Sequence, residues 1–206
     1  MLGFYNVSVI LTYLGLCGAV CGMGFAMDGR LGIAVALLMF SGLCDMFDGT
    51  IARATKRSED AQVFGIQIDS LCDLVCFGVY PAVIAYSVGV RGVFGMIVLS
   101  LFVLGGVIRL GYFNVIEQKR QQETKEEKGV FHGLPITASA WLIPLFYLVR
   151  ALLGGSGGIL ALEIYMLVIA LLFVLDIQIK NPKHALKYVG AAVLLLAAVA
   201  AVLLLR

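Results

Sequence analysis

Long apolar runs constrain this chain more than any other feature. Apolar residues make up 61% of its 206 residues and charged residues only 14%, against about 45–50% and about 25% in a typical soluble domain. The excess lies in runs of about 18 residues or more, long enough for an apolar helix to cross a bilayer. Because lipid offers no hydrogen-bond partners to the backbone, helices are the default spanning element. The sequence therefore predicts an all-α, polytopic transmembrane helical bundle.

Short polar breaks divide the chain into about seven predicted spans, with six to eight as the range. One long polar segment, Glu117 to Gly129, follows the fourth span, and we interpret it as a solvated extension of that helix. No internal repeat or low-complexity tract is present, so we expect one integral-membrane domain over residues 1–206. The predicted spans are 6–27, 31–52, 65–88, 92–115, 134–152, 159–177 and 187–205.

The distribution of Lys and Arg predicts the orientation. These residues gather in the connections after the second, fourth and sixth spans and are few in the other connections. The positive-inside rule places the richer side in the cytoplasm, and the N-terminus with it. The N-terminus lacks a basic region and a clear small-residue cleavage site, so we expect the first helix to be retained. We therefore expect an integral protein of the cell membrane.

Four aspartates occupy the second and third predicted helices, where an ionised carboxylate costs about 2.5–3.5 kcal/mol at the membrane centre. Asp45 and Asp48 stand three positions apart, and Asp69 and Asp73 four apart, so each pair shares one helix face. A short polar turn joins the two helices, so the two faces can oppose each other at one depth. Four carboxylates in this arrangement form a ligand set for Mg2+ or Mn2+, alone or as a close pair of ions.

A structural role is the other interpretation of the four acids. Arg53, Lys56 and Arg57 in the following turn can form salt bridges with some of them.

The five cysteines lie in apolar stretches without nearby histidines, so we interpret them as packing residues and not as zinc ligands. They are Cys17, Cys21, Cys44, Cys72 and Cys76.

Small residues accompany the acids. Gly65, Asp69 and Asp73 form a stripe along one helix face, and Gly49 and Ala52 flank the other pair. Such a face leaves a hollow for a flat group, although helix packing explains any single glycine equally well. Glycines at four-residue spacing in the first helix similarly favour close helix packing.

Together these residues read Asp45-x2-Asp48-Gly49-x2-Ala52-Arg53-x11-Gly65-x3-Asp69-x3-Asp73. This pattern resembles the signature of the CDP-alcohol phosphotransferase family, with all eight signature residues present. The spacer between Arg53 and Gly65 is slightly longer than usual, but it lies in a turn where insertions are tolerated.

The resemblance implies that a CDP-linked lipid gives its phosphatidyl group to an alcohol and that CMP leaves. It also implies a site at the cytoplasmic ends of the second and third helices, with two metal ions, and it assigns a role to each signature residue. Asp45, Asp48 and Asp69 hold a metal at the pyrophosphate, whereas Asp73 helps to hold a second ion and acts as general base. Gly49, Ala52 and Gly65 make room for the cytidine, and Arg53 pairs with a donor phosphate or braces the acids.

Further segments resemble the phosphatidylserine synthase branch of the family. They are Phe64 to Val79, Arg109 to Asn114, Phe131 to Pro135 and Ile179 to Pro182. For this branch the acceptor is L-serine and the donor CDP-diacylglycerol, or a CDP-archaeol in an archaeal host. We expect Arg109, a cation inside an apolar span, to bind the serine carboxylate, with Asn114 also on the acceptor side. An ion pair between Arg109 and an aspartate is the alternative.

The expected partners are the CDP-lipid, L-serine and membrane lipid, and the resemblance implies a homodimer. We expect no nucleic-acid partner. A phosphorylated acceptor, such as glycerol phosphate or inositol phosphate, should need more basic residues near Asp73 than one buried arginine supplies. A divalent-cation transporter is the remote alternative, but it should place acids along a path through the bilayer. Here, apart from Glu163 and Asp176, the membrane acids gather at one end.

Overall fold

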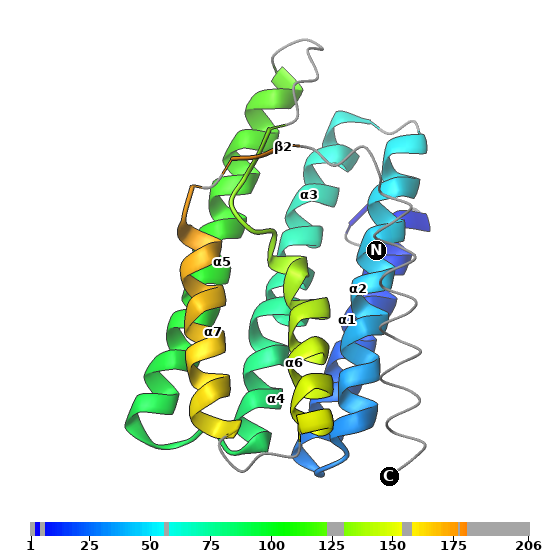
Figure 1. Cartoon of the computed structure of the whole chain (residues 1–206). Helices are drawn as coiled ribbons and strands as arrows, with labels where there is room; N and C mark the ends of the chain where they lie inside the picture. The colour runs from blue at the N-terminus through cyan, green and yellow to red at the C-terminus, as the bar shows by residue number, and fades with distance from the viewer. Residues whose placement is uncertain are drawn as a thin grey trace.

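The computed structural model describes residues 3–4, 7–55, 58–122, 130–153, 158–176 and 178–180. Its helices stand side by side in an upright bundle, and α5 extends beyond the others at the top of the view (Figure 1). The helical elements in chain order are α1 (Val7–Met27), α2 (Leu31–Ala54), α3 (Glu59–Asp73), the π-helix η1 (Leu74–Val79), α4 (Tyr80–Val88), α5 (Gly92–Gln122), the 3-10 turn η2 (Ile136–Ala138), α6 (Ser139–Leu153) and α7 (Gly158–Val174). Two short strands complete the list, β1 (Val130–His132) and β2 (Gln178–Lys180).

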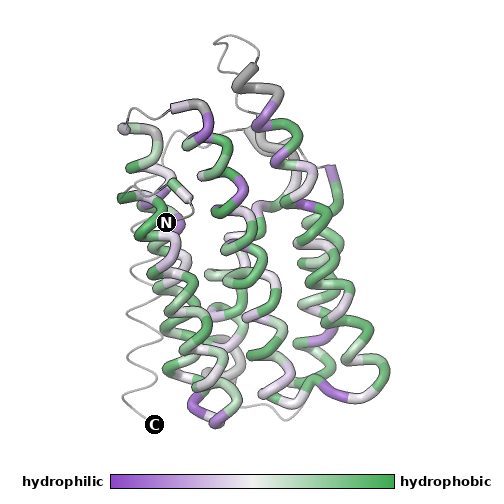
Figure 2. Tube along the Cα trace, turned by 180° about the vertical axis from the view of Figure 1, so that it is seen from behind, coloured by the Kyte–Doolittle hydropathy of each residue, from purple (hydrophilic) through white to green (hydrophobic). Residues whose placement is uncertain are grey.

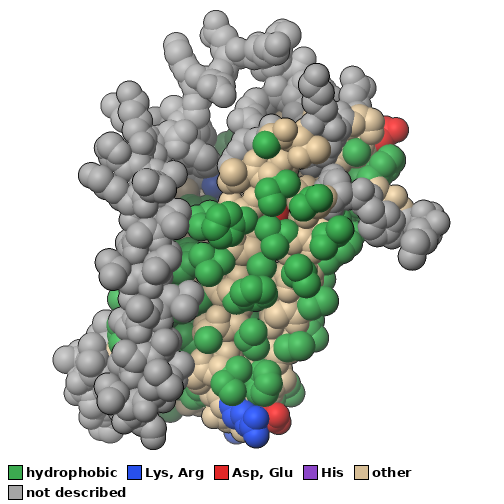
Figure 3. All heavy atoms as spheres, turned by 90° about the vertical axis from the view of Figure 1, so that its right-hand side faces the viewer, with side chains coloured by type: hydrophobic (Ala, Val, Ile, Leu, Met, Phe, Trp, Pro, Cys, Tyr) green, Lys and Arg blue, Asp and Glu red, His purple; other side chains and the backbone are tan. Residues whose placement is uncertain are grey.

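Among the described residues, four helical stretches are long and apolar enough to cross a membrane, which confirms the prediction of a membrane helical bundle. They are Val7–Met27, Leu31–Ala52, Asp60–Val88 and Gly92–Gln118. Apolar residues dominate along the helices, and hydrophilic residues collect towards their ends (Figure 2). One side of the molecule is largely covered by apolar side chains, with charged side chains at its lower edge (Figure 3). This distribution suits a surface surrounded by lipid.

The predicted spans need three adjustments. The third helix begins at Glu59, not at residue 65, because Ser58 caps its N-terminus by accepting a hydrogen bond from the Ala61 N–H. The fourth helix continues to Gln122, which confirms its extension that far; residues 123–129 lie outside the described part. The fifth and sixth spans correspond to shorter apolar helices, Ile136–Leu148 and Gly158–Val174, and the predicted span 187–205 lies outside the described residues.

The helical fold is as predicted, and the pairing of the two short strands β1 and β2 is a detail that the sequence did not predict. The two strands pair antiparallel, with Phe131 opposite Ile179 and His132 opposite Gln178. Strands of three residues are too short to show the alternation of polar and apolar residues by which a strand is predicted. The pairing joins two segments that resemble the serine branch and lie far apart in the chain.

Close helix contacts depend on small residues at defined positions. Gly22 of α1 faces the Tyr80 hydroxyl, and a Cβ at Gly22 would overlap it. The Tyr80 hydroxyl donates a hydrogen bond to the carbonyl of Ala34, which ties α4 to α2. Between α5 and α7, a Cβ at Gly105 would lie 2.9 Å from the Ala170 carbonyl oxygen. Helix packing therefore explains both glycines.

The π-helical segment that follows Asp73 has a local cause. Pro81 has no N–H, so the Phe77 carbonyl lacks the donor that an α-helix would supply four residues later. The hydroxyl of Ser139, which is fully buried, donates to that carbonyl at 2.8 Å instead. The Tyr80 N–H meanwhile bonds back to the Val75 carbonyl, five residues earlier. Asp73 thus stands immediately before a change of helical register, a feature often found at functional sites.

Candidate active site

Three of the predicted metal-binding side chains converge. Asp45 and Asp48 come from α2 and Asp69 comes from α3, and one carboxylate oxygen of each lies within 4.8 Å of those of the others. The spacing of three residues on α2 puts its two acids on the face that meets Asp69. The structure therefore brings together the two helix faces that the sequence predicted to oppose each other.

Asp73, the fourth acid, adjoins this cluster. Its carboxyl group shares a hydrogen bond with the carboxyl group of Asp45. Asp73 is the last residue of α3 and is buried, with 8% of its surface exposed. All four predicted acids therefore belong to one group that spans α2 and α3.

A partner from a third helix holds one of these acids. The Thr12 hydroxyl of α1 donates a hydrogen bond of 2.6 Å to Oδ2 of Asp48, whose side chain is 4% exposed. Thr12 lies outside the family signature, and its contact with Asp48 was not predicted from the sequence. Its only sequence signal is its position three residues before Gly15, on the face of α1 that packs against α2.

The donor set fits a hard divalent cation. It consists of carboxylate oxygens that lie close together and largely away from water, where their mutual repulsion calls for a compensating positive charge. The cationic side chains of the competing salt-bridge interpretation are not described: Lys56 and Arg57 lie outside the described residues, as does the side chain of Arg53. That alternative therefore stays a prediction.

The glycine that follows Asp48 borders open space. Among the described residues, no heavy atom outside its own stretch of α2 lies within 4 Å of a Cβ built on Gly49, so packing among them does not explain the glycine. The sequence-based prediction that a flat ligand group lies beside the acids stays a prediction. Ala52 and Gly65 lie on the same two helices and are half-buried.

Arg109 of α5 is buried, as a functional cation inside a membrane span should be, with 7% of its surface exposed. Its Nε donates a hydrogen bond of 3.1 Å to the Leu134 carbonyl, in the segment between β1 and η2. Within the described part of the chain, its guanidinium forms no ion pair with an acid, so the alternative of an aspartate partner finds no support there. Its guanidinium also lies over the ring of Phe113, with Cζ 5.8 Å from the ring centroid.

The neighbours of Arg109 along α5 fix its depth in the bundle. Asn114 accepts a hydrogen bond of 2.7 Å from the Ser70 hydroxyl of α3, next to Asp69. Gly106 precedes Arg109 by three residues, and a Cβ built on it would lie 3.9 Å from Cδ1 of Leu74, the residue after Asp73. Arg109 therefore lies along α5 at about the level of Asp73. Asn114 is brought close to the acid cluster through Ser70, which sequence reasoning did not single out.

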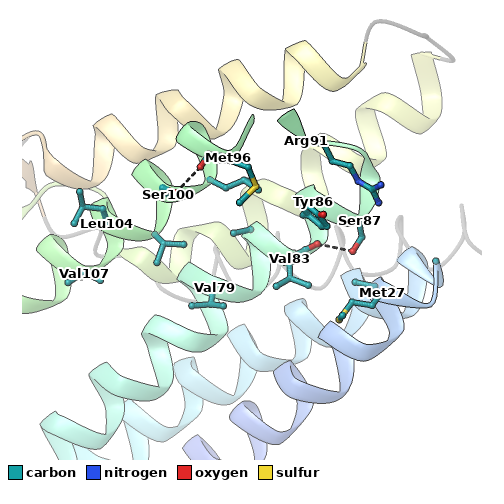
Figure 4. Close-up of a pocket in the computed structure, with 15 residues that line it drawn as sticks. Met27, Val79, Val83, Tyr86, Ser87, Arg91, Met96, Ser100, Leu104 and Val107 are labelled. Carbon is teal, nitrogen blue, oxygen red and sulfur yellow. Dashed lines mark hydrogen bonds between the residues drawn. The ribbon is translucent and has the colours of Figure 1, made fainter. Parts of the chain in front are cut away.

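The large hollow drawn in Figure 4 lies elsewhere. It has a volume of about 850 Å³ and is bordered by Met27, Val83, Arg91 and Leu104, among others. Met27 ends α1 and Arg91 stands in the α4–α5 turn, whereas Asp45 lies some four helical turns along α2 from the α1–α2 turn. The groove is mostly apolar and runs from that end of the bundle as far as Val79 and Val107. None of the four aspartates lines it, so it is not the candidate site.

Comparison with protein families gives a match over residues 5–175 to the CDP-alcohol phosphatidyltransferase model. The matched range contains every aspartate of the cluster as well as Arg109 and Asn114. The chain belongs to the CDP-alcohol phosphatidyltransferase family. The resemblance drawn from eight signature residues is therefore confirmed.

Relatives in this family carry names that specify serine. The CDP-diacylglycerol--serine O-phosphatidyltransferase of Saccharomyces cerevisiae is 41% identical over 112 residues, 53% of this chain and 40% of that protein. The archaetidylserine synthase of Methanothermobacter thermautotrophicus is 35% identical over 146 residues, covering 70% of this chain and 59% of that protein. A second archaeal relative, the CDP-diacylglycerol--serine O-phosphatidyltransferase of Methanocaldococcus jannaschii, is 34% identical over 80% of this chain and 72% of its own length. The chain thus spans about half the length of the first two family members.

Proposed function

We propose that this chain transfers the phosphatidyl group of a CDP-linked lipid to the hydroxyl of L-serine and releases CMP. The observation that carries the proposal is the convergence of Asp45, Asp48, Asp69 and Asp73 from two helices in a protein of this family. The names of the relatives support serine as the acceptor. The lipid is CDP-diacylglycerol or a CDP-archaeol, since relatives of both kinds are similar to this chain.

In the proposed reaction the serine hydroxyl oxygen attacks the phosphorus that carries the lipid. The new phosphorus–oxygen bond forms as the pyrophosphate bond to CMP breaks, and CMP leaves with the electron pair. Asp73 accepts the hydroxyl proton. It would do so in its ionised form, without the proton that it shares with Asp45 when no cation balances the two carboxyl groups. General-base help of this kind typically contributes about 10²–10⁴-fold to a rate.

Asp45, Asp48 and Asp69 would hold Mg2+ or Mn2+ at the donor pyrophosphate, and Asp73 would share a second ion. Bound there, the ions supply neutralisation of charge on the phosphoryl oxygens. The cytidine would lie over Gly49, Ala52 and Gly65, and the open space beside Gly49 supports this placement. Arg53, which follows in the signature, would pair with a donor phosphate.

Arg109 would orient the acceptor. A guanidinium can bind a carboxylate through two parallel hydrogen bonds. Among the described residues, the guanidinium of Arg109 donates a hydrogen bond from Nε to the Leu134 carbonyl and lies over the Phe113 ring. Asn114 would lie on the acceptor side as well, because Ser70 holds it close to Asp69. Serine would then reach the site with its carboxylate at Arg109 and its hydroxyl at Asp73.

Orientation and assembly complete the proposal. The basic residues of the α2–α3 connection support a cytoplasmic site with a cytoplasmic N-terminus in the cell membrane. We also propose a single domain over residues 1–206, since α1, α2, α4, α5, α6 and α7 all contribute to one apolar core. A homodimer is the assembly that the family resemblance implies, and light scattering of the purified protein measures it.

Product analysis tests the acceptor. The purified protein is incubated with CDP-diacylglycerol, Mn2+ and one alcohol at a time: L-serine, glycerol 3-phosphate or inositol 1-phosphate. Mass spectrometry of the lipids should detect phosphatidylserine, and CMP release should depend on serine. A lipid product from either phosphorylated alcohol but none from serine would refute the proposed acceptor while leaving the family assignment intact.

A further inference from the structure

Helix α1 contacts both α2 and α3, the two helices that carry the acids. It has no acidic residue of its own, yet its Thr12 reaches into the cluster. The Thr12 hydroxyl lies 2.6 Å from Oδ2 of Asp48 and 3.1 Å from the carbonyl oxygen of Ser8, one turn earlier in α1. A threonine hydroxyl has one proton, so it can donate to only one of these acceptors at a time.

The choice between the two acceptors favours Asp48. A hydrogen bond to an ionised oxygen is shorter and about twice as strong as one between neutral groups, and the contact with Asp48 is the shorter of the two. Donation to Oδ2 restrains rotation of the carboxylate, which also accepts a hydrogen bond from the Gly49 backbone N–H. Asp48 is 4% exposed, so water has little access to replace the hydroxyl.

The position of α1 against α2 is itself well defined one turn further along. A Cβ at Gly15 would lie 3.2 Å from the Cβ of Cys44, so the two helices touch there. The Ser41 hydroxyl donates a hydrogen bond of 2.8 Å across this contact to the Gly15 carbonyl. The close contact between α1 and α2 therefore holds Thr12 next to Asp48.

We propose that Thr12 is a positioning residue for the divalent cation: its hydroxyl holds the carboxylate of Asp48 in the orientation that binds the ion. The inference rests on the proposed function, because it takes Asp48 to be a ligand. Partners that orient a ligand typically change metal affinity by about 10–100-fold when they are removed.

Binding of Mn2+ to the purified full-length protein tests this without any turnover. Free Mn2+ is measured by electron paramagnetic resonance during a titration in the absence of CDP-lipid. Thr12→Val replaces the hydroxyl with a methyl group of similar size, Thr12→Ala removes it with less steric demand, and Thr12→Ser keeps it. Thr50→Val is the matched control, because the Thr50 hydroxyl is exposed and donates to the Met46 carbonyl of its own helix.

We expect the dissociation constant for Mn2+ to rise by about 10–100-fold in Thr12→Val and Thr12→Ala. Thr12→Ser should stay within about threefold of wild type, and Thr50→Val should match wild type. Retained wild-type affinity in either folded hydroxyl-free variant would overturn the proposal. Equal weakening in Thr12→Ser would do so too, because it would show that the methyl group and not the hydroxyl matters.

The wild-type titration separates this inference from the function on which it rests. If wild-type protein binds Mn2+ and the Thr12 variants bind it equally well, only the role of Thr12 fails. If wild-type protein binds no Mn2+ with or without CDP-lipid, the metal site itself fails and the role of Thr12 is refuted with it.

Discussion

The substitution Arg109→Lys tests two roles of this residue: the proposed binding of the serine carboxylate and the hydrogen bond to the Leu134 carbonyl. Lysine keeps the positive charge but loses the planar pair of terminal nitrogens and the Nε–H. In the proposed complex the terminal nitrogens bind the serine carboxylate. In the described structure Nε donates to the Leu134 carbonyl. The substitution should therefore affect acceptor binding and stability at once, by different mechanisms.

The magnitudes follow from these two contacts. Loss of one charge-assisted hydrogen bond to the carboxylate costs about 1.5–3 kcal/mol, which corresponds to a roughly tenfold to hundredfold higher KM for serine. The KM for the CDP-lipid should stay within about twofold, because the proposed donor contacts lie at the aspartates. Loss of the donor to the partly buried Leu134 carbonyl should cost about 1–3 kcal/mol of folding stability and lower the Tm.

The assay measures CMP release with each substrate varied in turn, together with thermal unfolding in the same detergent. Tyr165→Phe is the matched control, since it also removes a side-chain donor to a backbone carbonyl, that of Leu142, but on α7 and α6. Tyr165→Phe should lower the Tm and leave both KM values unchanged. A rise in the donor KM with an unchanged serine KM in Arg109→Lys would assign the guanidinium to the pyrophosphate and refute the reasoning.

Two further predictions concern the cation and the packing of α1. EDTA should abolish CMP release and Mg2+ or Mn2+ should restore it; full activity in excess chelator would exclude the metal site. Gly22→Ala should lower stability by about 1–3 kcal/mol, because its Cβ would overlap the Tyr80 hydroxyl, and thermal unfolding measures the loss. Gly24→Ala in the same helix is the control, because its Cβ would have no atom of the described residues outside its own helix backbone within 4 Å. An equal Tm shift in both variants would contradict the packing argument.

The sequence predicted the acids well because helical spacing is a local property. Asp45 and Asp48 share a helix face wherever the helix goes, and a short turn brings the next helix back to the same depth. The convergence with Asp69 and the proximity of Asp73 follow from these two facts. The burial of Arg109 was equally predictable, since a guanidinium inside an apolar span cannot face lipid.

Contacts between distant segments were beyond prediction from one sequence. Nothing near Thr12 indicates that its hydroxyl faces Asp48, 36 residues later. The bond between Ser70 and Asn114 likewise depends on how α3 and α5 pack. The π-helical segment after Asp73 has a partial sequence signal in Pro81, but its replacement donor, Ser139, comes from another helix. In each case a short side chain meets a partner whose position only the tertiary structure defines.

Turnover by Asp73→Asn tests the central claim most directly. An asparagine amide can still donate to the Asp45 carboxylate, so the variant should fold, bind the CDP-lipid through the remaining acids and yet lack a group that accepts the serine proton. We expect phosphatidylserine and CMP to form in equal amounts with wild-type protein, and their rate to fall by about 10²–10⁴-fold in the variant with donor binding largely retained. A rate near that of wild type would contradict the assignment of Asp73 as the base, and with it the proposed mechanism.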